Sequence, residues 1–289
     1  MNAIRTCSLI LYISLTIILI GEEAMGFIEK YIKTSPSPFN EEQFDNIKYQ
    51  LSKPDTDSNE SSIEQYPLVV YLHGAGERGT DNNKQIKGLA FLGNGSSAQA
   101  REFRKEYPCF VYVPQCPLHA SWEGAVLSNV IHTIEHLKST RPIDPKRLYL
   151  IGYSMGGSGA YELATAYHDF NGQLFAAIIR LAGQSDFDNR VHEIIAKTAT
   201  WIHIGLLDTP QRIEKARDAY VRLKKIHNNP PEKKQILNIN GWRGETFSLT
   251  IDNQEKVKLT EYSGIGHGIN LLAFDNPVLL EWLFDQKLK

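Results

Sequence analysis

One stretch decides the fold of this chain: Arg147-Leu-Tyr-Leu-Ile-Gly152, followed directly by Tyr153-Ser-Met-Gly156. Its first half is a short continuous apolar run, which is typical of a strand buried on both faces of a sheet. Its second half completes the pattern Gly-x-Ser-x-Gly, in which a serine occupies a sharp turn between a strand and a helix. The glycines permit this turn because they have no side chains that would clash. Ser154 is therefore a candidate nucleophile.

Other segments on both sides of this stretch predict an alternation of strands and helices. Strand-like runs are expected at 46–51, 67–72, 109–113, 176–181, 200–204 and 257–262. Segments with helical periodicity are expected at 124–138, 156–168, 211–226 and 277–288. Short apolar strands that alternate with helices predict an α/β fold, a mostly parallel sheet with helices on both faces. Sites in such sheets form at the carboxyl ends of strands, so functional residues are expected in the loops that follow the strands.

The composition fits this class and excludes others. The 289 residues include 31 Lys and Arg against 33 Asp and Glu, a net charge of −2. This balance gives no reason to expect a nucleic acid or an anionic membrane surface as a partner. Hydrophobic residues make up 42% and charged residues 22%, as in ordinary globular proteins. The length suits one large domain, or two small ones, with a core that needs no disulfide or metal.

The N-terminus has the features of a secretory signal peptide. Arg5 precedes an apolar run over 7–20, and Ala24-Met-Gly26 offers a small-x-small cleavage site. The apolar run is too short for a membrane span, which needs about 20 residues. We therefore predict a signal peptide over 1–26, a catalytic domain over 27–289 and a secreted or periplasmic location. An uncleaved membrane anchor is the alternative.

Two cysteines follow the predicted leader, Cys109 and Cys116. Export would permit a disulfide between them. Cys109 opens an expected strand, however, and an extended strand separates its ends by far more than the ~5.5–6 Å that a disulfide spans. Both are therefore predicted to be free and buried.

The loop after the 67–72 run contains His73-Gly-Ala-Gly76. Small residues at this place, before a serine turn, can supply a backbone N–H group to a developing oxyanion. We expect this N–H group from Ala75 and a second one from Met155. A phosphate-binding loop is the rival interpretation, but the Lys-Ser/Thr pair that such a loop needs does not follow. The adjacent charges of Glu77 and Arg78 are expected to hold the loop.

A serine nucleophile needs a base, and the base needs a carboxylate that orients it. His267 lies in Gly264-Ile-Gly-His-Gly268, directly after the last expected strand, where a sharp loop could bring its imidazole to Ser154. Asp208 follows the 200–204 run and is the expected acid. Asp186 and Asp188, after the preceding strand, are the alternatives. Asp208 could instead be a helix N-cap, a common place for Asp.

A second pattern, His132-Thr-Ile-Glu-His136, matches a zinc-protease motif. It places two imidazoles one helical turn apart, but no separate third ligand stands out. The motif lies in a helix that is expected to pack on a face of the sheet, away from the strand ends. We therefore predict an ordinary helix surface and no metal.

The segment over 227–255 interrupts the alternation. Asn228-Asn-Pro-Pro231 should end the preceding helix, and 236–251 is predicted to be a hairpin around Asn240-Gly241. This insertion could flank the site or could be a surface decoration. Trp122 and Trp242 could form aromatic walls for a sugar or phenolic ester, or could simply contribute to packing.

Four pieces of the sequence together resemble a known family. They are Tyr66-Pro-Leu-Val-Val-Tyr-Leu-His-Gly-Ala-Gly-Glu-Arg-Gly79, Pro114-Gln-Cys-Pro117 with Trp122, Gly152-Tyr-Ser-Met-Gly-Gly157, and Gly266-His-Gly268 leading to Glu281-Trp282. With these pieces the chain, from about Asn46 onward, resembles the secreted bacterial phospholipase/carboxylesterases. That family is close to feruloyl, acetyl-xylan and polyhydroxybutyrate-depolymerase-like esterases.

The resemblance implies the α/β-hydrolase fold, serine esterase activity and the triad Ser154, Asp208 and His267. Two features depart from the family. The loop after Asp208 lacks the usual His-Gly and Pro-Val-Val-Pro pieces, and the insertion over 227–255 is longer than expected.

These observations predict a serine esterase with no cofactor, acting on a small-molecule or polysaccharide-borne ester. Three alternatives share the motifs. A prolyl-oligopeptidase-like peptidase normally carries a large additional domain. A non-catalytic binding module would be expected to lose a triad member, and all three are present. An acyltransferase would use the same acyl-enzyme.

Overall fold

The computed structural model describes residues 39–54, 65–86, 89, 103–239 and 241–289. The strands are β1 (Phe39–Phe44), β2 (Ile47–Ser52), β3 (Tyr66–Leu72), β4 (Phe110–Pro114), β5 (Ile143–Tyr153), β6 (Ala177–Leu181), β7 (Ala199–Gly205), β8 (Glu232–Ile239), β9 (Trp242–Ile251) and β10 (Gln254–Tyr262). The helices are η1 (Ala75–Glu77), η2 (Lys84–Ile86), α3 (Gly124–Thr140), α4 (Met155–Asn171), α5 (Asn189–Ile195), α6 (Pro210–Ile226), α7 (Asn270–Phe274) and α8 (Pro277–Phe284).

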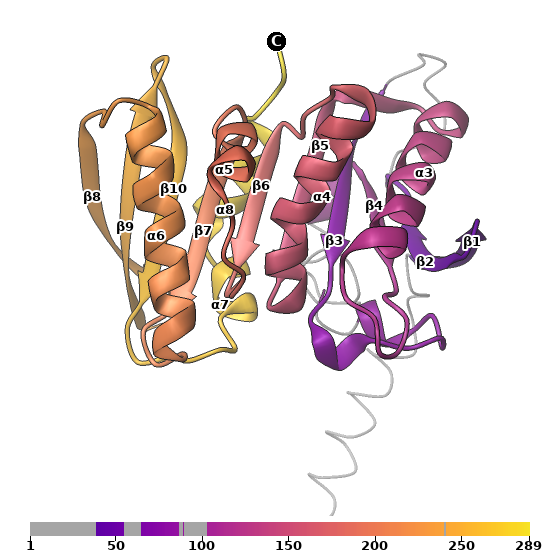
Figure 1. The fold of residues 1–289 in the computed structure, drawn as a ribbon, viewed down its shortest axis with the longest axis horizontal. Helices are drawn as coiled ribbons and strands as arrows, with labels where there is room; N and C mark the ends of the chain where they lie inside the picture. The colour runs from indigo at the N-terminus through magenta and orange to yellow at the C-terminus, as the bar shows by residue number, and fades with distance from the viewer. Residues whose placement is uncertain (1–38, 55–64, 87–88, 90–102, 240) are drawn as a thin grey trace, which may run out of the picture.

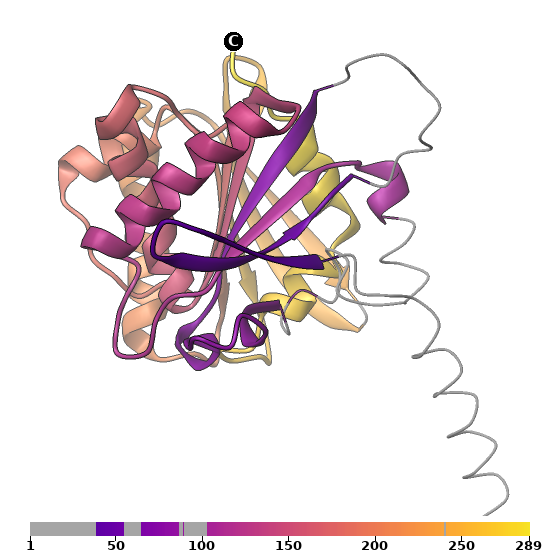
Figure 2. The same ribbon diagram turned by 90° about the vertical axis from the view of Figure 1, so that its right-hand side faces the viewer.

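The strands form one sheet in the order β1-β2-β4-β3-β5-β6-β7-β10-β9-β8 (Figure 1). Its centre, from β4 to β10, is parallel, whereas β1 and β2 at one edge and β9 and β8 at the other are antiparallel. Helices α3 to α6 cover one face, and α7 and α8 lie on the other (Figures 1 and 2). The predicted mostly parallel α/β sheet is therefore confirmed.

The apolar runs form the core because helices cover both sheet faces. All seven residues of β7 are buried, as are all five of β6. On one side Trp201 of β7 packs edge-on against Trp282 of α8, with ring centroids 5.2 Å apart. Burial of every residue explains why these strands are predominantly apolar and lack the alternation of a strand with one exposed face. Cys109 and Cys116 are free and buried, as predicted.

Some elements differ from the expectation. The short helix α5 lies where no helix was predicted, and Asp188 caps it by accepting a hydrogen bond from the Val191 N–H. The edge strand β1 was missed because its sequence, Phe-Asn-Glu-Glu-Gln-Phe, is mostly polar. Helix α8 ends at Phe284, before the predicted boundary at 288.

The 227–255 segment extends the sheet. Helix α6 ends at Ile226, and β8 and β9 then form an antiparallel hairpin with Gly241 in its turn. β9 pairs with β10, so Trp242 lies near the carboxyl end of β10. The predicted hairpin forms, although β8 begins at Glu232 and not at 236.

The predicted signal peptide over 1–26 lies outside the described residues. Among the residues that are described, no helix has both the length and the apolar character that crossing a membrane requires.

Two buried histidines should make the fold sensitive to acid. Burial, with a smaller contribution from Lys258, lowers the pKa of His203 to about 3. Burial also lowers the pKa of His73 to about 4, with a smaller lowering effect from Arg78, although the hydrogen bond to Gly74 acts in the opposite direction. An unfolded histidine binds its proton near pH 6.5. Between pH 6.5 and these lower values the unfolded chain therefore binds more protons, and the free energy of unfolding must fall as the pH falls.

We expect the free energy of unfolding to drop between pH 6.5 and 4 by about 1.4 kcal/mol per pH unit for each such histidine. Replacing His203 by Phe, which retains a ring beside Trp201, should reduce this slope by about one histidine's share. Urea unfolding at several pH values measures it. His119→Gln, at an exposed position, is the control and should keep the wild-type slope. An unchanged slope in His203→Phe would contradict the assignment.

Candidate active site

Ser154 occupies a strained turn between β5 and α4. Its φ is 56° and its ψ is −113°, a conformation that residues other than glycine rarely adopt. The surrounding structure fixes this conformation, since the Ser154 N–H donates a hydrogen bond to the Leu181 carbonyl at 2.9 Å. The turn directs the serine away from its own helix, and its side chain makes no cap bond to α4.

The two glycines of the pattern are required by packing. A Cβ atom at Gly152 would overlap the carbonyl of Gly156, and one at Gly156 would overlap the carbonyl of Leu72. The start of α4 therefore lies directly against the end of β3. A larger residue at either position would force the helix away from the sheet and displace Ser154.

The structure brings Ser154, His267 and Asp208 together. The His267 Nε2 atom lies 2.8 Å from the Ser154 Oγ atom, and the His267 Nδ1 atom lies 2.8 Å from the Asp208 Oδ2 atom. Asp208 as a carboxylate can only accept, so Nδ1 carries a proton and Nε2 is free to accept the Ser154 O–H. The three side chains come from the loops after β7 and β10 and from the turn after β5, all at the carboxyl edge of the sheet.

Asp208 is held as a carboxylate. Its side chain is only 2% exposed, and burial alone would raise its pKa. Hydrogen bonds from His267 and from the Thr209 N–H, together with the charge of Arg212, outweigh burial and lower the pKa below its usual value. The Oδ1 atom accepts from Thr209 at 2.7 Å and from the Arg212 Nη1 at 3.2 Å.

The rival acids lie in other surroundings. Asp186 is 61% exposed and pairs with the Nζ atom of Lys215 at 2.9 Å, while Asp188 caps α5. Thr209, and not Asp208, is the N-cap of α6. Asp208 is thus the acid that contacts His267.

The loop that carries His267 is held by β5 and by the loop after β7. The Tyr153 O–H donates to the His267 carbonyl at 3.1 Å, and the Leu207 N–H donates to the Ile265 carbonyl at 2.9 Å. Tyr153 is the variable residue of the Gly-x-Ser-x-Gly pattern, so nothing in that pattern indicates this role.

A buried histidine holds the loop that contains Ala75. The Cys116 N–H donates to the Nε2 atom of His73 at 2.9 Å, so the proton of this neutral ring is on Nδ1, which donates to the Gly74 carbonyl at 2.6 Å. The Trp122 Nε1–H donates to the His73 carbonyl at 2.9 Å. These contacts fix the backbone directly before Ala75.

A cavity of about 350 Å³ lies beside Ser154. Ala75 and Met155, the residues expected to supply oxyanion N–H groups, both line it. Most of its remaining lining is polar or charged: Arg78, Ser121, Glu123, Ser158, Glu162, Gln184, Ser185 and Arg212, with Trp122 and Gly159. Another cavity of about 460 Å³ lies between α5 and α6, but it contains none of the three grouped side chains.

Solved structures with a similar fold are esterases. A thermostable esterase is 28% identical, with a TM-score of 0.65, over 89% of this chain and 64% of its own. This chain has the α/β-hydrolase fold. An acetyl xylan esterase from Aspergillus awamori has a TM-score of 0.60 at 16% identity over 85% of this chain and 98% of its own. A ferulic acid esterase has a TM-score of 0.55 at 13% identity, over 85% and 96%.

The chain therefore spans 64% of the length of the thermostable esterase that it matches. Comparison with models of protein families and with curated proteins finds no match.

Trp122, Trp242 and Arg78, which the sequence analysis also singled out, lie in different surroundings. Trp122 is 2% exposed and lines the cavity, whereas Trp242 is 39% exposed, packs against Gly264 and does not line it. Arg78 holds its loop through backbone carbonyls, donating to those of Ala75 and Ala120, each at 3.1 Å.

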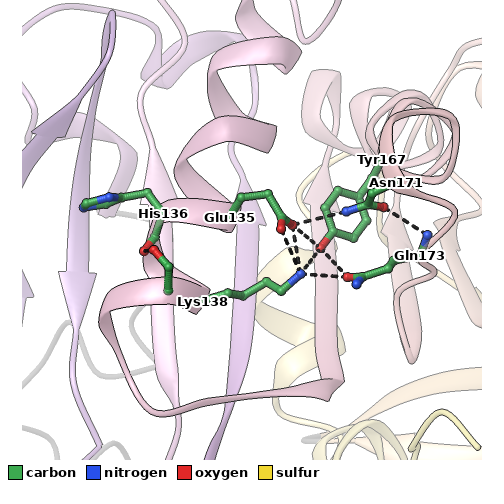
Figure 3. Close-up of polar contacts among 7 residues, drawn as sticks. Glu135, His136, Lys138, Tyr167, Asn171 and Gln173 are labelled. Atoms are coloured by element: carbon green, nitrogen blue, oxygen red, sulfur yellow. Dashed lines mark hydrogen bonds and ion pairs between the residues drawn. The ribbon is translucent and has the colours of Figure 1, made fainter.

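The zinc-protease pattern lies in α3, and the side chains of Glu135 and His136 point in opposite directions (Figure 3). Glu135 accepts hydrogen bonds from Lys138 at 2.9 Å and from the Tyr167 O–H at 2.7 Å. His136 instead stacks on Phe44 of β1, with ring centroids 4.1 Å apart, and His132 lies 3.2 Å from Asp45. Each of the three has a contact that explains its position within the packing of α3.

Proposed function

We propose that this protein is a serine esterase that hydrolyses carboxylic esters through an acyl-enzyme on Ser154. The observation that supports it best is the pair of 2.8 Å contacts linking Ser154, His267 and Asp208 in the order that serine hydrolysis needs. The esterase structures with the same fold agree with this chemistry.

In the first half of the proposed reaction, the Ser154 Oγ atom attacks the ester carbonyl while His267 Nε2 takes its proton. The negative charge that develops on the carbonyl oxygen is stabilised by the N–H groups of Ala75 and Met155, which are fixed in place before the substrate binds. The bond to the alcohol then breaks, and His267 passes the proton to the departing oxygen.

In the second half, His267 removes a proton from water as that water attacks the acyl carbon. The bond to Ser154 Oγ breaks, the serine regains a proton from His267 and the carboxylic acid leaves. Asp208 contributes by holding the imidazole tautomer whose Nε2 can accept, and by stabilising the imidazolium formed in each half.

The cavity beside Ser154 favours a polar substrate. Ligand pockets for apolar groups are lined mostly by apolar and aromatic side chains. Here the lining includes two arginines, two glutamates and several hydroxyl groups, and a buried alkyl chain would strip water from these groups without replacing it. An ester of a hydroxyl-rich alcohol, with a short acyl group, could form hydrogen bonds with them.

Ser154→Ala should lower kcat by about 10⁴-fold or more with the fold intact, because the triad acts as a unit. A fluorophosphonate probe should label the wild-type protein at Ser154 and should not label the alanine variant. Ser128→Ala, on the exposed side of α3, is the control and should keep both activity and labelling. Labelling at another serine, or substantial activity in Ser154→Ala, would refute the proposal.

Asp208→Asn should leave Ser154 and His267 in place but cost about 10⁴-fold in kcat, because the amide favours the wrong imidazole tautomer. Asp186→Asn removes a carboxylate that is paired with Lys215 on the surface and should have little effect on kcat. Kinetics on an activated ester, with circular dichroism as the folding check, compare the two. A large loss in Asp186→Asn alone would move the acid to the loop after β6.

Among acetylated glucose, hexyl acetate and methyl decanoate, the sugar ester should have the highest kcat/KM. In an apolar pocket each buried CH₂ group would contribute about 0.8 kcal/mol to binding, so kcat/KM would instead rise with chain length. Initial rates with pH-stat titration measure all three. A preference for methyl decanoate would overturn the polar-substrate part of the proposal. Peptide anilides are a fourth class of substrate to test, and cleavage of these alone would favour a peptidase.

A further inference from the structure

Arg212 contacts the acid of the candidate triad from the first turn of α6. Its Nη1 atom lies 3.2 Å from the Asp208 Oδ1 atom, and the other oxygen of this carboxylate contacts His267. The arginine side chain is 21% exposed and the aspartate 2%. Arg212 also lines the cavity beside Ser154.

The position is locally unfavourable for an arginine. Arg212 is the third residue after the N-cap, Thr209, and the N-terminus of a helix carries partial positive charge that repels cations. The first turn of α6 contains no acidic residue that would offset this. The Nε atom of Arg212 is also buried and has no hydrogen-bond partner within the described part of the chain.

An unfavourable charge position and an unpaired buried donor are usually retained only where function requires them. Here the contact of Arg212 with Asp208 offsets both.

The contacts around His267 show what Arg212 does. Asp208 faces the imidazole from the loop after β7, with its Oδ2 atom 2.8 Å from Nδ1. Tyr153 faces the same ring from the end of β5, with ring centroids 5.3 Å apart. Arg212 contacts the Oδ1 atom of Asp208, the carboxylate oxygen that does not contact His267.

We propose that Arg212 is a positioning residue of the triad: by holding the Oδ1 atom, it keeps the Oδ2 atom of the Asp208 carboxylate directed at His267. This inference rests on the proposed function, since it assigns Arg212 a role in activating Ser154.

The experiment measures the rate at which a fluorophosphonate labels Ser154 at the optimum pH, a readout that needs no knowledge of the natural substrate. Arg212→Gln keeps a hydrogen-bond donor but removes the charge, Arg212→Lys keeps the charge, and Arg212→Met removes both. Arg222→Gln is the matched control, because Arg222 pairs with Asp218 at the same spacing further along α6, at 2.7 Å.

Arg212→Met should slow labelling at the optimum pH by about tenfold, because Asp208 is no longer fixed. Arg212→Lys keeps a charged hydrogen-bond donor and should restore most of the wild-type rate. Arg212→Gln, with a shorter and neutral donor, should fall between these two. Arg222→Gln should match the wild type.

Labelling of Arg212→Met at the wild-type rate would overturn the proposal, as would a rate in Arg212→Lys no higher than in Arg212→Met, or a loss of equal size in Arg222→Gln. Circular dichroism identifies a variant that fails to fold, and the Lys and Gln variants then still decide the question. Absence of wild-type labelling at Ser154 would instead refute the proposed esterase mechanism. The two failures are therefore distinguishable.

Discussion

The close approach of α4 to the sheet is the constraint on which the site depends. Gly156 lies so near the Leu72 carbonyl that no side chain fits between them, and Ser154 adopts its strained conformation because the chain must turn at once from β5 into this helix. The strained turn is held on both sides by the parallel sheet, since β5 pairs with β3 up to Gly152 and with β6 up to Tyr153.

The register of the sheet then determines which loops meet Ser154. Leu72 pairs with Gly152, and Tyr262 at the end of β10 pairs with Gly205 at the end of β7. Because parallel strands end at the same edge, residues that follow them by a few positions converge there. Asp208 and His267, 59 positions apart in the chain, become neighbours because of that pairing. The proposed triad therefore depends first on where the strands end and then on the side chains that follow them.

This explains why much of the site could be predicted from the sequence and some of it could not. Ser154, His267 and Asp208 each follow an apolar run: the Gly-x-Ser-x-Gly pattern indicated the serine, a glycine-rich loop the histidine, and chain order favoured Asp208 over Asp186 and Asp188. Tyr153, His73 and Arg212 act through contacts with backbone or side chains from other strand ends, and nothing in their local sequence distinguishes them. The fold followed the same rule: the buried strands of the sheet centre were predicted, whereas the polar edge strand β1 and the seven-residue helix α5 were missed.

Two residues of the site adopt locally unfavourable arrangements that neighbouring contacts stabilise. Ser154 adopts a backbone conformation that its residue type disfavours, and Arg212 occupies a helix position that its charge disfavours. Neither would persist unless the surrounding contacts overdetermined it: the Leu181 carbonyl and the packing of Gly156 for the serine, and the Asp208 carboxylate for the arginine. Asp208 links the two, since its one oxygen faces the arginine and its other oxygen faces the histidine that contacts the serine. A sequence selected for stability alone would avoid both penalties. Because both occur within one series of hydrogen-bonded side chains, they are an argument that these side chains form the functional site.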